Sequence, residues 1–119
     1  MSRFRWPLTR FVVRDTSMLP TLRPGDRLLV WTWASPRAGD LVVLRDPELP
    51  GLHLVKRVAA CPGESLPAVG GLVGYAVLGE TAAESRDSRT FGRVPPDLIV
   101  GRVVWRYLPV VRRGRVARR

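Results

Sequence analysis

Short apolar runs separated by turn-forming residues recur along the whole chain. The runs are rich in β-branched side chains, which favours strands over helices. The predicted strands are 11–13, 27–33, 41–44, 52–58, 75–78 and 98–107, the last interrupted at Gly101. Turns such as Arg23–Asp26 and Pro36–Asp40 combine glycine, proline and aspartate, and no convincing amphipathic helix is present. The pattern predicts a mostly β fold, either a folded sheet or a partly closed barrel, with little helix.

The length and the distribution of charge predict one domain with basic ends. A chain of 119 residues is expected to fold as a single domain. We place this domain at residues 12–109, after a basic lead at 1–11 and before a basic, disordered tail at 110–119. The tail is dominated by arginine and has little to bury, so we expect it to be dispensable for chemistry.

The formal net charge of +10 is large for this length and suggests an acidic partner. Much of it lies at the two ends of the chain, and terminal runs of charge are usually solvated. No aromatic-basic motif of a nucleic-acid reader occurs, so no nucleic-acid partner is expected. Weak contact with an anionic membrane surface stays open as an alternative.

Location and cofactors follow from what the sequence lacks. No stretch approaches about 18 consecutive apolar residues, and the N-terminus has no secretory signal. Cys61 is the single cysteine, which excludes an internal disulfide framework. We therefore expect a cytoplasmic protein without a metal or another cofactor.

Lys56 is the only lysine in the chain, among nineteen arginines. In a strand at Leu52–Val58, alternation places it on the same face as Leu54 and Val58, with His53 and Arg57 on the other face. A lysine on an apolar face is desolvated, which lowers its pKa and makes the neutral amine a usable general base. Arginine cannot serve this purpose because it stays protonated. The alternative is a lysine whose ammonium reaches water from the end of the strand.

A base needs a nucleophile, and Ser17 is a candidate, although its segment Thr16–Leu22 is not a catalytic signature by residue type alone. A serine hydroxyl is weak without a nearby base, and a serine–lysine pair is a known variant of the serine–histidine arrangement. His53 is the only histidine, so a Ser-His-Asp triad has one candidate base, which faces away from Lys56. A Cys61–His53 pair is the weaker alternative, because a cysteine at a strand end is more often a packing residue.

Several short motifs occur in an order that resembles the type I signal peptidases. The resemblance covers about residues 12–108. The motifs are 17–22 (SMLPTL), 25–30 (GDRLLV), 39–43 (GDLVV), 56–60 (KRVAA) with 63–64 (GE), and 79–80 (GE) with 85–89 (SRDSR) and 91–92 (FG). Each motif alone is weak, but their order is specific. The resemblance implies a β-rich fold with folded antiparallel sheets and a serine–lysine catalytic dyad.

The resemblance also assigns roles to individual residues. Ser17 matches the nucleophile, Lys56 matches the general base, and Ser85 matches a serine that orients the lysine amine. The amide of Ser17 is expected to be an oxyanion donor. Four further positions match supporting residues: Asp87 and Arg89 as an ion pair that braces the site, and Met18 and Pro20 as residues that shape the surroundings of the nucleophile.

Two departures from the family pattern lie close to this site. Asp15 stands where the family often has serine or glycine, and a carboxylate near the oxyanion would oppose catalysis. We therefore expect Asp15 to point away from the nucleophile or to pair with an arginine. The usual Gly-Asp-Asn is replaced by Gly79-Glu80-Thr81, which affects the local turn rather than the dyad.

Together these features predict a soluble serine endopeptidase that removes an N-terminal leader from a precursor protein. A short chain with this order of motifs resembles the maturation proteases of nickel-type superoxide dismutase, which implies that precursor as substrate. One alternative is signal-peptidase-type cleavage of exported precursors at the membrane surface. Another is a basic binding module without catalytic activity.

Overall fold

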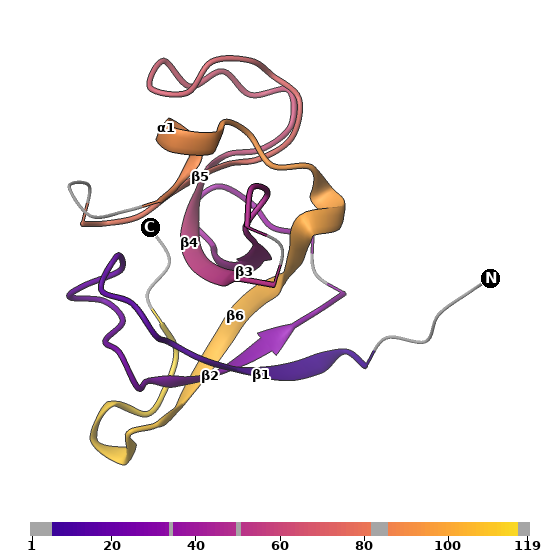
Figure 1. Cartoon of the computed structure of the whole chain (residues 1–119). Helices are drawn as coiled ribbons and strands as arrows, with labels where there is room; N and C mark the ends of the chain where they lie inside the picture. Colours follow the sequence, from indigo (N-terminus) through magenta and orange to yellow (C-terminus); the bar gives the residue numbers. More distant parts are fainter. Residues whose placement is uncertain (1–5, 34, 50, 82–85, 117–119) are drawn as a thin grey trace.

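The computed structural model describes residues 6–33, 35–49, 51–81 and 86–116. The strands are β1 (Leu8–Val12), β2 (Arg27–Trp31), β3 (Leu41–Arg45), β4 (His53–Ala60), β5 (Ala76–Leu78) and β6 (Ile99–Leu108) (Figure 1). The helical elements are short: α1 (Ser88–Phe91) and the 3₁₀ turns η2 (Pro96–Leu98) and η3 (Val110–Arg112). None of the helices in the described ranges has the length and apolar character that crossing a bilayer requires.

The strands form one antiparallel sheet in the order β1-β2-β6-β3-β4-β5. The predicted mostly β fold with little helix is thereby confirmed. The sheet is strongly twisted but not closed, since β1 and β5 are its two edges. Strand β6 lies inside the sheet between β2 and β3, and so joins the N-terminal hairpin to the β3–β4 hairpin (Figure 1).

The expected interruption at Gly101 is wrong, because β6 runs through this residue without a break. A Cβ at this position would lie 2.5 Å from the carbonyl oxygen of Trp31 and 2.8 Å from Cγ1 of Val30. Glycine is therefore needed for the close approach of β6 to β2 rather than for a turn. Sequence pattern alone does not distinguish these two uses of glycine.

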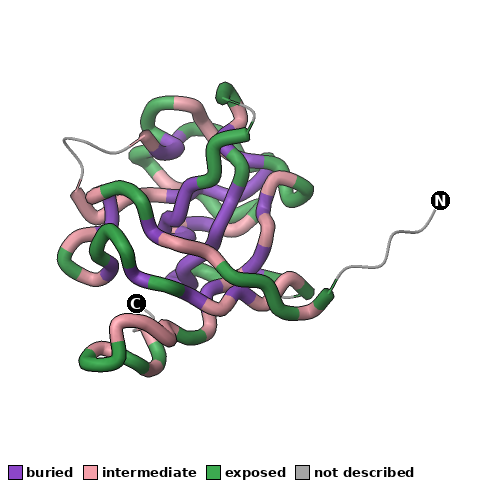
Figure 2. Tube along the Cα trace, turned by 60° about the horizontal axis from the view of Figure 1, so that its bottom comes forward, coloured by how far each residue is buried: buried purple, intermediate pink, exposed green. Residues whose placement is uncertain are grey.

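Apolar side chains pack into two main clusters on the sheet, visible as the buried centre of the chain in Figure 2. The first includes Val13, Met18 and Leu22, which flank or lie within the segment of Ser17. The second includes Leu54 and Val58 from β4. The first cluster thus fixes the Ser17 segment, and the second surrounds the strand that carries Lys56.

Both ends of the predicted domain differ from the structure. Strand β1 begins at Leu8, inside the expected lead. The described part of the expected tail is ordered against the domain: η3 follows Pro109, and Gly114 pairs with Arg106 in both directions, with N–O distances of 2.8 and 2.9 Å. Arg112 forms an ion pair with Asp26, and Val116 packs against the first core cluster. The arginine-rich composition suggested a solvated tail. Composition alone does not reveal that a buried acid and an apolar surface of the domain lie within reach of the tail.

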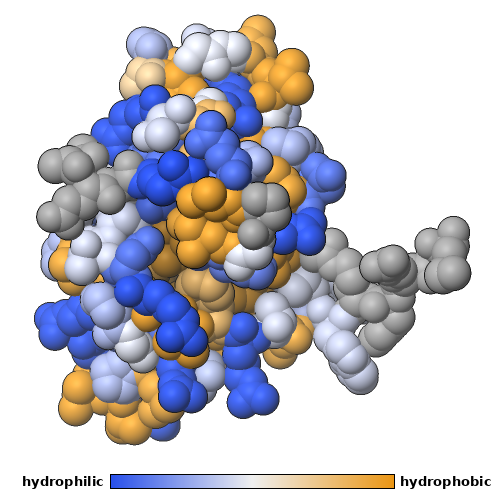
Figure 3. Space-filling view, in the orientation of Figure 1, coloured by the Kyte–Doolittle hydropathy of each residue, from blue (hydrophilic) through white to orange (hydrophobic). Residues whose placement is uncertain are grey.

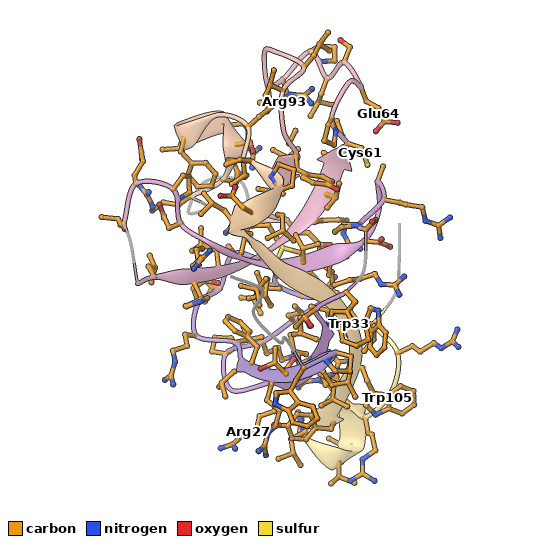
Figure 4. The ribbon with its side chains drawn as sticks, turned by 90° about the vertical axis from the view of Figure 1, so that its right-hand side faces the viewer. Arg27, Trp33, Cys61, Glu64, Arg93 and Trp105 are labelled. Carbon is orange, nitrogen blue, oxygen red and sulfur yellow. The ribbon has the colours of Figure 1, made fainter. Side chains whose placement is uncertain are left out.

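A long loop connects β4 to β5, and Arg93 ties it to the domain. Its guanidinium donates to the carbonyl oxygens of Cys61 at 3.3 Å and Gly74 at 3.1 Å, and to that of Glu64. Figure 4 shows Arg93, Glu64 and Cys61 together at one end of the molecule. The tie holds the two ends of the loop together and so supports the pairing of the short edge strand β5 with β4.

Candidate active site

Ser17 lies in a tight segment between β1 and β2 that is held by its apolar neighbours. Leu19 donates to Thr16 O at 3.1 Å and Leu22 donates to Met18 O at 2.9 Å, so one turn contains the serine and a second turn follows it. Met18 and Leu22 are fully buried, and Ser17 is itself only 3% exposed. The packing therefore fixes the position of a hydroxyl group beneath the surface.

Lys56 lies in the middle of β4, opposite Val42 of β3, and its side chain is completely buried. It shares its face with Leu54 and Val58, as alternation along the strand predicts. Its Nζ lies 2.6 Å from Oγ of Ser17. The structure thus brings together the two residues that the sequence singled out, from positions 39 residues apart.

Burial lowers the pKa of Lys56 below its ordinary value of 10.5. The negative charges of Asp15, Asp87 and Asp46 oppose this effect, in that order among the acids, and Arg89 reinforces it. Desolvation is the largest cause, because an ammonium ion in an apolar surrounding loses its hydration. Burial therefore makes the neutral amine easier to form here than in water, next to a serine hydroxyl, and a general base must be able to lose its proton in this way.

The expectation for Asp15 is wrong, since its carboxylate turns toward the nucleophile and accepts from Ser17 twice. The Ser17 amide donates to Oδ1 at 3.3 Å and the Ser17 hydroxyl donates to the same oxygen at 3.1 Å. No ion pair of Asp15 with an arginine is found within the described ranges. Two residues of separation are enough for an aspartate to reach its own backbone, which is a common local arrangement.

Asp87 braces the wall of the site beside Lys56. Its carboxylate caps α1 through the amide of Arg89, receives the amide of Gly79 at 2.9 Å, and pairs with the Arg89 guanidinium. Burial alone would raise the pKa of Asp87, but these hydrogen bonds outweigh burial and hold the pKa below its ordinary value. The ion pair expected from the sequence is present, and the hydrogen bond from the Gly79 amide to the same carboxylate joins α1 to the chain that follows β5.

A second brace acts directly on Ser17, and sequence reasoning gave it no role. The amides of Glu80 and Thr81 donate to the carbonyl oxygen of Ser17 at 2.8 and 2.9 Å. The Glu80 side chain accepts from Thr21 at 2.6 Å and from Arg57 at 2.6 Å. Thr21, Arg57 and Glu80 belong to the family-like motifs, but only the fold shows that they lie around the Ser17 segment.

The other predicted residues are placed as follows. Met18 is fully buried beneath Ser17, and Pro20 follows it on the surface after a cis peptide bond from Leu19. Ser85 lies outside the described residues, so its expected contact with Lys56 stays a prediction.

The histidine and cysteine alternatives receive no support from the geometry. Within the described contacts, the Ser17 hydroxyl bonds to Lys56 and Asp15 and not to His53. Cys61 lies just beyond β4, where its thiol contacts the carbonyl oxygen of Pro36 at 3.5 Å. Among the described residues, no three histidine, cysteine or acidic side chains gather where they could hold a metal ion.

A groove of about 460 Å³ runs between the free edge of β1 and the start of β4. Its lining includes Phe11 and Arg14 on one side and Leu52 and His53 on the other. Ser17 and Lys56 do not line it, but Arg14 precedes Ser17 and His53 precedes Lys56 by three residues each. The groove is therefore lined by residues that shortly precede Ser17 and Lys56 in the sequence.

Comparison with known proteins gives a consistent result over almost the whole chain. The family described as "Signal peptidase, peptidase S26" matches residues 5–73 and 73–108. The mitochondrial ATP-independent inner membrane protease subunit 1b of Arabidopsis thaliana is 38% identical over 111 residues, covering 78% of this chain and 66% of the relative. Signal peptidase I of Leptolyngbya laminosa is 32% identical over 141 residues, covering 86% and 70%. The chain thus spans about two thirds of the length of these relatives.

Proposed function

The chain belongs to the signal peptidase, peptidase S26, family, and we propose that it is a serine endopeptidase that uses Ser17 as nucleophile and Lys56 as general base. The observation that carries this proposal is the 2.6 Å contact between Lys56 Nζ and Ser17 Oγ in a buried site. A binding module has no need for a desolvated lysine held against a serine hydroxyl. The lowered pKa of Lys56 supports the role of the amine as a base.

The reaction proceeds in two proton-transfer cycles. Neutral Lys56 accepts the proton of Ser17 Oγ as this oxygen attacks the scissile carbonyl, and the amide of Ser17 is positioned to donate to the oxyanion. The resulting ammonium returns the proton to the leaving amine, which departs with the new N-terminus. Water then hydrolyses the ester on Ser17, with Lys56 again accepting and returning one proton.

The substrate is bound as an extended strand in the groove beside β1. This edge strand presents backbone groups that no other strand uses on its outer side, in the part of the chain that the structure describes. A peptide can pair with such an edge and place its side chains alternately in the groove and in solvent. The pairing would carry the peptide along Phe11 and Arg14 toward Ser17.

For the substrate itself we favour the precursor of nickel-type superoxide dismutase, cleaved in the cytoplasm to release its leader. The support for this choice is the order of motifs, which resembles that of the corresponding maturation proteases.

A second candidate is cleavage of exported precursors at a membrane surface. Two kinds of observation favour it. The relatives include a signal peptidase and an inner membrane protease. Trp33 and Trp105 are exposed near Arg27 at one end of the molecule (Figure 4). Hydrophobic side chains also gather around η3, at the bottom of the view in Figure 3, where Val110 and Val111 are exposed. Tryptophan and arginine together suit the interface of an anionic bilayer.

One experiment tests the chemistry and separates the two substrates. Purified protein is incubated with the dismutase precursor in solution and, separately, with an exported precursor on anionic vesicles, and the new N-terminus is read by mass spectrometry. We expect leader removal from the dismutase precursor, and none with Ser17→Ala or Lys56→Arg. Cleavage only on vesicles would favour the second candidate, and cleavage that persists in Lys56→Arg would refute the general-base role.

A further inference from the structure

Asp15 accepts hydrogen bonds from both the hydroxyl and the amide of Ser17, and so determines where these two protons point. The Ser17 hydroxyl donates to Asp15, so Lys56 acts as the donor in its own contact with Ser17 Oγ. The Ser17 amide, which the reaction needs for the oxyanion, is also directed at Asp15. In this arrangement the hydroxyl proton is directed at Asp15 instead of at the amine that must accept it, and the oxyanion donor is occupied by a carboxylate, which describes a resting state.

The charge of Asp15 is unusual for its surroundings. The other acids around the site are engaged by arginines: Asp46 by Arg86 and Asp87 by Arg89. Asp15 is exposed, and in the described part of the chain its hydrogen bonds go to Ser17 alone. In a protein of net charge +10, an acid beside the nucleophile without an arginine partner is accessible to a cation from outside.

Resting on the proposed function, we propose that Asp15 is a specificity-determining residue, which releases Ser17 when the substrate carries a cationic side chain within two residues of the scissile bond. A guanidinium or ammonium that pairs with the carboxylate withdraws it from the Ser17 amide and hydroxyl. The amide is then available to the oxyanion, and the hydroxyl can donate to a neutral Lys56. A substrate without the cation leaves the negative charge close to the oxyanion, which opposes the reaction.

The limit of two residues follows from distances in the site. Asp15 Oδ1 lies 3.1 Å from the oxygen that attacks the scissile carbon. An extended chain advances about 3.3 Å per residue, so a long side chain up to two residues away can reach the carboxylate. Arg14, which lines the groove, is the neighbour of Asp15 in the sequence, so a peptide in the groove lies along the segment that leads to this carboxylate.

The test moves a single arginine through the four positions nearest the cleavage site of a neutral peptide, with glutamine at the same position as the matched comparison. Wild type is compared with Asp15→Asn and Asp15→Ser. The control is Asp97→Asn, which makes the same change of charge at an exposed acid of η2. For each pair of peptides, kcat/KM is measured between about pH 6 and 10, a range that extends from near the ordinary pKa of histidine to near that of lysine.

We expect one position at which wild type and Asp97→Asn prefer arginine over glutamine by about fivefold or more, a ratio typical of one ion pair. In both Asp15 variants this preference falls to about twofold or less, and the glutamine peptide is cleaved faster than by wild type. The negative charge of Asp15 raises the pKa of Lys56, so its removal lowers this pKa while Asp46, Asp87 and Arg89 stay in place. The pH–rate profile of these variants therefore also moves to lower pH.

A purely structural Asp15 would reduce activity on both peptides without a change in their ratio or in the pH profile, and this result overturns the proposal. Equal preference for arginine in wild type and both Asp15 variants overturns it as well and leaves the proposed function intact. If wild type cleaves no more peptide than Ser17→Ala does, the proposed function fails, and the inference fails with it.

Discussion

Glu80 offers a sharp test of how the nucleophile segment is held. The side chains of Glu80 and Arg57 are each 10% exposed, and the guanidinium binds the carboxylate through Nε at 3.0 Å and Nη2 at 2.6 Å. Removing one partner of a buried ion pair destabilises a protein by about 3–5 kcal/mol, because the remaining charge loses its compensation. Glu80→Ala also removes the acceptor of the Thr21 hydroxyl. We therefore expect a loss of about 3 kcal/mol, the lower end of the range, because some solvent reaches the pair.

The assay is denaturant unfolding, in which the midpoint should fall at an unchanged slope. Glu48→Ala is the matched control, since Glu48 also binds an arginine but its side chain is 57% exposed. A surface pair of this kind is worth about 1 kcal/mol or less. Glu80→Ala should in addition slow peptide cleavage, because the amides of residues 80 and 81 hold the carbonyl of Ser17. A destabilisation by Glu80→Ala no larger than that by Glu48→Ala would refute this reasoning.

Three further predictions concern stability. Deleting residues 110–119 should lower the free energy of unfolding by about 2 kcal/mol or more, since an ion pair, backbone bonds and an apolar contact are lost; an unchanged unfolding midpoint would show that these contacts do not matter. Gly101→Ala should destabilise by more than about 2 kcal/mol through its clash with β2, whereas Gly70→Ala, which meets open space, should change the melting temperature little. The pKa of Lys56 is lowered on folding, so the unfolded chain binds more protons between the folded pKa and 10.5; wild-type stability should rise with pH across this window, and Lys56→Met should abolish that rise.

The strands and the inward face of Lys56 could be predicted from local patterns, whereas the contact between Ser17 and Lys56 was expected only from the resemblance in motif order. Lys56 alternates with apolar residues in a clear strand, and Ser17 lies within a recognisable motif. Gly101 could not be interpreted, because a glycine for a turn and one for close packing have the same local pattern. The docking of Val116 depends on a surface that forms only when distant strands meet.

Asp15 shows a different limit of sequence reasoning. A carboxylate near the oxyanion opposes catalysis, but this electrostatic effect does not decide where the side chain points. The local backbone turns this side chain onto Ser17 regardless of the electrostatic disadvantage, because an amide and a hydroxyl are the nearest donors. This arrangement is the basis of the specificity role that we propose for Asp15.

The central claim is that Lys56 is a neutral base next to Ser17, and its direct test is the titration of its ammonium. Because Lys56 is the only lysine, protein labelled with ¹³C at the lysine ε-carbon gives a single side-chain lysine resonance, without assignment. The account predicts a midpoint below the ordinary value of 10.5 in the folded protein and a return to that value in denaturant. A folded protein whose lysine titrates at or above 10.5 would contradict it.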